Sequence, residues 1–84
     1  MAEIFRYRGI KFIIYSDDHD PDHCHAKSAD FEVKIDISGE EPVLMDVTTD
    51  GSKESKFQKT ALKLAQTRLD ELKAAMEAIK DARN

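Results

Sequence analysis

Apolar and polar residues alternate along the first half of the chain with the period of two that is typical of β-strands. The clearest case is residues 31–37, where four apolar side chains alternate with charged ones. We expect further extended segments at residues 5–8, 10–15, 23–28 and 43–47. Gly9 lies between the segments 5–8 and 10–15, and we expect a bulge or kink to join them there.

Turn-forming residues separate the later segments. Pro21 ends the strand before it, because proline fixes φ and lacks an N–H group. Residues 38–42, Ser-Gly-Glu-Glu-Pro, have the composition of a turn. The pattern therefore predicts a meander of about four antiparallel strands over residues 1–50, with a histidine-rich loop at residues 17–26.

The last third of the chain has the helical period instead. Ser55 and Gln58 form a possible capping box, and we expect one long helix over residues 53–83. Its apolar positions are three or four residues apart: Leu62, Ala65, Leu69, Leu72, Met76 and Ile79. The part over residues 56–82 alone would be roughly 40 Å long, against about 30 Å for a compact domain of this size, so the helix either breaks or overhangs.

Two uses of this apolar stripe remain open. It packs across one face of the sheet, or it contacts a protein partner or a second copy of the chain to form a homodimer. Either way the predicted fold class is α+β, with a small antiparallel sheet packed by one long C-terminal helix. We expect a single domain over residues 1–84.

Length and composition indicate how stable the chain is and in which compartment we expect it. A chain of 84 residues buries only about 60–65% of its unfolded surface, so a metal or an oligomer partner would add useful stability. The single cysteine excludes an internal disulfide framework and fits a reducing compartment. We expect neither a signal peptide nor a membrane span, and hence a cytoplasmic protein.

Charge is unevenly distributed along the chain. Residues 1–52 carry 5 Lys/Arg and 12 Asp/Glu, a net −7, whereas residues 53–84 carry 8 and 5, a net +3. The acidic half repels phosphates and attracts cations. No arginine-rich run or interleaved aromatic pattern indicates nucleic-acid binding, so we do not expect it.

The densest chemistry lies in residues 17–25, which hold all three histidines, the only cysteine and four aspartates. On an extended chain, His23 and His25 project from one face about 7 Å apart, and Cys24 points to the other. His19, together with Asp18 or Asp20, is the candidate to complete a site for Zn²⁺ or another divalent metal. The spacing matches neither a Cys-x-x-Cys zinc site nor the His-Glu-x-x-His of a zinc protease.

Other interpretations of the same residues stay open. His19 with Asp18 or Asp20 is a possible acid–base pair, which leaves the question of an enzyme undecided. A nuclease-type toxin would need cations near the site, and Arg6, Arg8 and Lys27 are the nearest. In the simplest alternative the histidines are hydrogen-bonded loop and strand residues, Cys24 is a small buried side chain, and the chain is a non-catalytic interaction module.

Residues 9–37 also resemble a known family. Gly9-Ile10, Tyr15, the run from Asp18 to Ala26, and Val33-Lys34-Ile35-Asp36-Ile37 are similar to the family named domain of unknown function 4160. Its signature runs Asp-His-x-Pro-Pro-His-Phe-His-Ala and then a strand ending Ile-Asp-Ile. This chain has Asp22 in place of the second proline and Cys24 in place of phenylalanine.

The resemblance carries over Asp18, His19, Pro21, His23, His25 and Ala26. It implies a small, bacterial, cytoplasmic protein without an established activity. Members of the family often neighbour another small uncharacterised domain, which implies a regulatory or toxin–antitoxin-like role.

Overall fold

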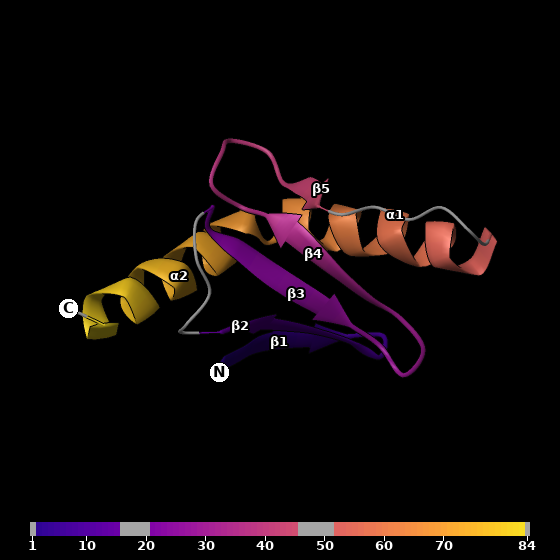
Figure 1. Cartoon of the computed structure of the whole chain (residues 1–84), viewed down its shortest axis with the longest axis horizontal. Coiled ribbons are helices and arrows are strands. Elements are labelled where there is room, and N and C mark those ends of the chain that lie inside the picture. The colour runs from indigo at the N-terminus through magenta and orange to yellow at the C-terminus, as the bar shows by residue number, and fades with distance from the viewer. Residues whose placement is uncertain (1, 16–20, 46–51, 84) are drawn as a thin grey trace.

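Five antiparallel strands and two helices make up the part of the chain that the computed structural model describes, namely residues 2–15, 21–45 and 52–83. The sheet has the sequence order β1-β2-β3-β4-β5 (Figure 1). Its strands are β1 (Ala2–Tyr7), β2 (Ile10–Ile14), β3 (His23–Lys27), β4 (Glu32–Asp36) and β5 (Val43–Met45). The helices are α1 (Ser52–Thr67) and α2 (Leu69–Arg83). The α+β class and the meander are confirmed, while the prediction of about four strands and one helix is corrected to five and two.

The additional strand comes from a tight turn at Gly9. Arg8 and Gly9 have φ values of 50° and 79°, and Tyr7 pairs with Ile10 on the far side of the turn. Two consecutive positive φ values are typical of the two-residue turns whose twist suits a β-hairpin. The expected bulge or kink at Gly9 is therefore wrong, because the chain reverses there and β1 lies antiparallel to β2.

Both helices cover the same face of the sheet (Figure 1). The main apolar core lies between the helices and the sheet. Phe12, Ile14, Ile35 and Leu72 are fully buried there. The rings of Phe5 and Phe12, which pair across β1 and β2, stack with centroids 4.5 Å apart. Burying one large apolar side chain contributes about 1.5–3 kcal/mol, so these contacts provide most of the driving force for folding.

A bend separates the two helices at Arg68. The backbone hydrogen bonds continue through it, from Arg68 N to Leu64 O and from Leu72 N to Arg68 O, both 3.1 Å long. Just before the bend, the Thr67 hydroxyl donates to the Lys63 carbonyl at 2.9 Å. A threonine that bonds back to the preceding turn often bends a helix, and the bend lets the two halves follow the twisted sheet.

The apolar stripe of the helices packs against the sheet, with Ala61, Ala65, Leu72 and Met76 buried. This is the first of the two uses expected for the stripe; a protein partner or a homodimer through the C-terminal helix stays a prediction. Helix α1 begins at Ser52, so Ser55 lies inside the helix and the predicted cap there is wrong. None of the described helices combines the length and the apolar character needed to cross a bilayer.

Candidate functional site

The histidines that the structure describes lie on the sheet face that the helices leave uncovered. Strand β3 alternates, so His23 and His25 project from this face while Cys24 and Ala26 enter the core on the other. The second part of the expected loop at residues 17–26 is therefore a strand from His23 onward. Although no helix covers them, His23 and His25 are only 7% and 6% exposed.

The two imidazole rings lie side by side, with centroids 5.3 Å apart and a 53° tilt. Each Nδ1 has a fixed acceptor: the carbonyl oxygen of Pro21, 2.8 Å from His23, and Oε2 of Glu32, 3.0 Å from His25. Because a carbonyl or carboxylate oxygen accepts, Nδ1 carries the proton, and in the neutral ring the lone pair is then on Nε2. Both rings thus have the same tautomer.

Tyr15 and Glu32 complete the immediate surroundings of His25. The Tyr15 ring contacts His25 edge to face, at 4.6 Å between centroids and 89° between planes. Glu32 reaches His25 diagonally, since His25 pairs with Lys34 in the β3–β4 ladder and Glu32 precedes Lys34 by two residues. Sequence reasoning gave neither residue a role. The strand alternation that puts Tyr15 and Glu32 on the face of His25 was the available signal.

Asp36 lies directly opposite His23 in the ladder. Its Oδ1 accepts from the Ser38 hydroxyl at 2.6 Å and from the Ser38 backbone N–H at 2.8 Å. These two bonds hold the pKa of the Asp36 carboxyl below its usual value, with a smaller effect from the nearby His23. The face therefore keeps a carboxylate beside the histidines over the physiological pH range.

Cys24 does not belong to this site. Its side chain is fully buried among core residues on the opposite face of β3. Burial raises the pKa of the Cys24 thiol from 9.0 to about 12, so the group is a neutral thiol near pH 7. The prediction that Cys24 is a small buried apolar side chain is confirmed.

Two of the four predicted ligands, Asp18 and His19, lie outside the described residues, so their place in the site stays a prediction. His23 and His25 are brought together as the sequence predicted. Within residues 2–15, 21–45 and 52–83, no group of three or more His, Cys, Asp or Glu side chains is arranged to hold a metal ion.

The fold and the site define a small α+β domain whose meander sheet is covered by helices on one face and carries a histidine pair on the other. The chain belongs to the family described as Domain of unknown function (DUF4160), whose model matches residues 9–78. Comparisons with curated proteins and with solved structures gave no match.

Proposed function

We propose that the face of the sheet that the helices leave uncovered (the open face) binds a divalent metal ion through Nε2 of His23 and Nε2 of His25. Zinc is the best candidate. The observation that carries the proposal is the pair of Nδ1 hydrogen bonds, to the Pro21 carbonyl and to the Glu32 carboxylate. Histidines that bind metals almost always donate the other ring N–H to a carbonyl or carboxylate, which orients the ring and directs the lone pair to the metal.

The ring separation supports the same conclusion. Two imidazoles bound to one tetrahedral ion at about 2.0–2.1 Å have centroids roughly 5.2 Å apart, and the rings of His23 and His25 are 5.3 Å apart. Neutral imidazole nitrogens suit zinc and other borderline ions better than they suit magnesium or calcium. The type and the separation of these two imidazoles therefore support the proposal.

Further ligands would come from His19 and Asp18. Both precede Pro21 by a few residues, and Pro21 already contacts the ring of His23 through its carbonyl. A third protein ligand with one open position would give a catalytic type of zinc site, and a fourth would give a structural one. A structural ion would also add stability to a chain of only 84 residues.

The test is a titration of the metal-stripped full chain with Zn²⁺ near pH 7, followed by histidine-ring NMR and thermal unfolding. We expect shifts of His23 and His25 that saturate at one equivalent, and a gain of about 2.7 kcal/mol in stability at a free concentration of 100 Kd. His23→Ala and His25→Ala should abolish both effects. Cys24→Ala is the matched control, because it changes the residue between them but faces the core. An unchanged wild-type spectrum, or equal loss in Cys24→Ala, would refute the proposal.

Metal-free acid–base chemistry is the second candidate, because His25 and Glu32 form a hydrogen-bonded dyad at 3.0 Å. Such a carboxylate orients the imidazole so that Nε2 takes a proton from a substrate or from water. Hydrolysis of a phosphodiester by metal-stripped protein, lost in His25→Ala and kept in Cys24→Ala, would favour this candidate. Hydrolysis unaffected by His25→Ala would exclude it.

For the cellular role, we propose regulation in a toxin–antitoxin-like pair, which the family resemblance suggests. A nuclease-type toxin should arrest growth on expression and lose that effect in His25→Ala. A non-catalytic module should instead form a dimer in sedimentation, or show helix resonances that a protein partner shifts. Growth arrest that persists in His25→Ala would separate the role from the histidine site.

A further inference from the structure

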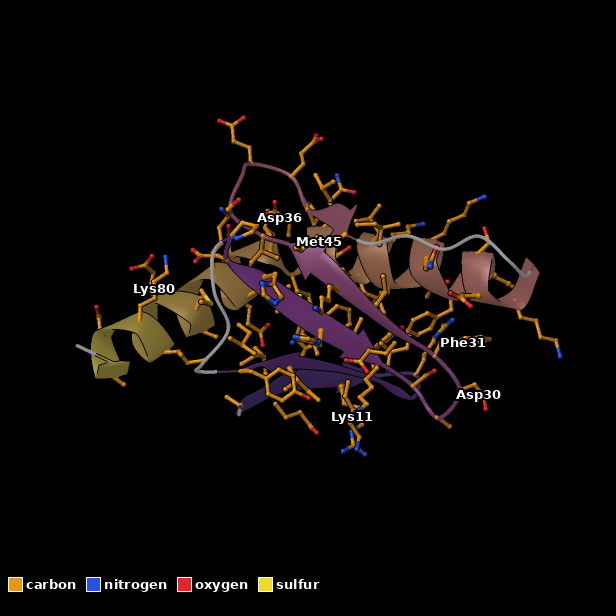
Figure 2. The ribbon with its side chains drawn as sticks, in the orientation of Figure 1. Lys11, Asp30, Phe31, Asp36, Met45 and Lys80 are labelled. Atoms are coloured by element: carbon orange, nitrogen blue, oxygen red, sulfur yellow. The ribbon has the colours of Figure 1, made fainter. Side chains whose placement is uncertain are left out.

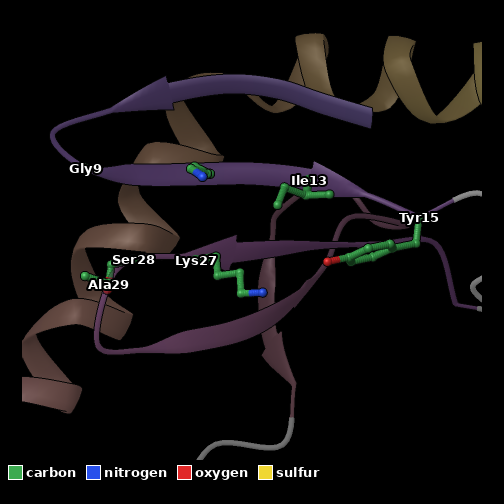
Figure 3. Close-up of a pocket in the computed structure, with 7 residues that line it drawn as sticks. Gly9, Ile13, Tyr15, Lys27, Ser28 and Ala29 are labelled. Carbon is green, nitrogen blue, oxygen red and sulfur yellow. The ribbon is translucent and has the colours of Figure 1, made fainter. Parts of the chain in front are cut away.

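We infer that a pocket on the open face, next to the histidines, binds a small phosphate monoester. The cavity has a volume of about 440 Å³ and lies over β2, β3 and the start of the β3–β4 turn (Figure 3). This volume is within the range of about 300–1,000 Å³ that is usual for small-molecule sites. Lys11, Lys27, Tyr15, Ile13 and Ser28 are among the residues that line it.

Two lysines give the pocket its charge. Lys11 and Lys27 are directly opposite each other in the β2–β3 ladder, and both side chains are exposed. Like charges at directly opposed positions destabilise an antiparallel sheet, so an anion between them would relieve a real repulsion. Within the described residues, neither lysine makes an ion pair: Glu32, opposite Lys27, bonds to His25 instead.

The third donor is the hydroxyl of Tyr15. Figure 3 shows the Tyr15 ring and the Lys27 side chain extending toward one another across the pocket. Lys11 projects from β2 away from both helices (Figure 2). Two ammonium groups and a phenol match a dianion with three terminal oxygens, since lysine binds phosphate as a point charge.

The rest of the lining suits the organic part of an ester. The side chain of Ile13 and the ring of Tyr15 are apolar surfaces between the donors and the histidine pair. The wall at Ser28 is fixed, because the Ser28 hydroxyl accepts from the Phe31 backbone N–H at 3.1 Å and closes the turn. A Cβ built on Gly9 would meet no atom within 4 Å, so this end of the pocket is open to the ligand.

Proximity to the histidines suggests why such a ligand would bind here. Ile13 pairs with His25 across β2 and β3, and the Tyr15 ring contacts both His25 and the pocket. A phosphate held by the lysines would thus lie beside the histidine pair. The inference does not depend on the metal: binding requires only the lysines and Tyr15, and the test uses metal-stripped protein.

The experiment is a ¹H–¹⁵N NMR titration of the full chain with inorganic phosphate and, separately, with phenyl phosphate, with NaCl to hold ionic strength constant. We expect saturable shifts in β2, β3 and residues 28–29 with both probes. Tighter binding of phenyl phosphate would assign the pocket to esters, and equal binding would assign it to free phosphate. The double variant Lys11→Gln/Lys27→Gln should bind at least about tenfold more weakly.

Two controls make the result decisive. Lys59→Gln/Lys63→Gln removes the same charge from the exposed face of α1 and should bind like wild type. The pocket variant should unfold at the same or a higher temperature in phosphate-free buffer, because the opposed lysines are gone, so weaker binding would not reflect unfolding. No saturable shifts in wild type, unchanged binding in the pocket variant, or an equal loss in the α1 variant would each overturn the inference.

Discussion

Replacing Glu32 by glutamine tests whether the hydrogen bond to His25 prepares that ring for a metal. The amide has nearly the same shape as the carboxylate, and its oxygen still accepts from Nδ1, but it carries no charge. The bond at 3.0 Å would persist in a weaker form. The ring would then be held less firmly in the tautomer that presents Nε2.

The expected magnitudes differ between the two states of the protein. Loss of a carboxylate behind a metal-binding histidine typically lowers metal affinity 10- to 100-fold, which is about 1.4–2.8 kcal/mol. In the metal-free protein the same contact matters little, because the Glu32 side chain is 43% exposed and such a pair contributes on the order of 0–1 kcal/mol. Glu32→Gln should therefore weaken Zn²⁺ binding much more than it weakens the apo fold.

Competition of metal-stripped protein with a chromophoric zinc chelator measures the first quantity, and urea unfolding without metal measures the second. Glu40→Gln is the matched control, because Glu40 is an exposed glutamate in the β4–β5 connection. Zinc affinity unchanged in Glu32→Gln, or lowered equally in Glu40→Gln, would show that the Glu32–His25 contact does not prepare a metal ligand.

Three further predictions concern the scaffold. Native Cys24 should resist a thiol reagent at pH 8, because burial raises the pKa of its thiol from 9.0 to about 12. The contribution of the protonated thiol to stability is therefore complete below pH 9 and is lost as the pH rises toward 12. The difference in unfolding free energy between the wild type and Cys24→Ala, measured against pH, checks this. Gly9→Ala should cost about 1–2 kcal/mol in urea unfolding because φ there is 79°, whereas Gly39→Ala, where no such φ occurs, should not. The lowered pKa of Asp36 gives stability that is present at neutral pH and lost as pH falls through the folded pKa; Ser38→Ala should raise that pKa in a carboxyl NMR titration, and an unchanged value would contradict the hydrogen-bond explanation.

Period-two alternation was enough to predict most of the sheet. It identified β4, because one side of that strand must be apolar to meet the helices. It failed at Arg8 and Gly9, where a glycine in a short apolar run is compatible with either a bulge or a tight turn. Only the pairing of Tyr7 with Ile10 decides between them, and that pairing is a property of the folded sheet.

The bend at Arg68 shows a different limit. The apolar spacing continues across it without a glycine or proline, so the pattern predicts one helix. A single helix of that length must either break or overhang, but its length does not show at which residue. The hydroxyl of Thr67 was the local signal, but the sequence alone does not show whether that hydroxyl bonds back to the preceding turn.

The site was predictable only as far as it follows strand geometry. The pairing of His23 with His25 and the exclusion of Cys24 depend on alternation alone, and both are confirmed. The hydrogen bond to Glu32 depends on the β3–β4 register, and the contact with Tyr15 depends on the β2–β3 register, which pairs His25 with Ile13. Neither can be read from one segment by itself.

The same geometry shows how the residues next to the two histidines hold β3 against the helix layer. Cys24 lies wholly in the core, so its side chain packs under the helices and takes no part in the histidine face. Asp22 forms an ion pair with Lys80 of α2 at 2.5 Å, and its backbone oxygen accepts from Ile37 N at 2.9 Å. A proline at position 22 would keep the second contact but not the first. Asp22 and Cys24 thus help to hold β3 against the helices, while His23 and His25 lie side by side on the opposite face.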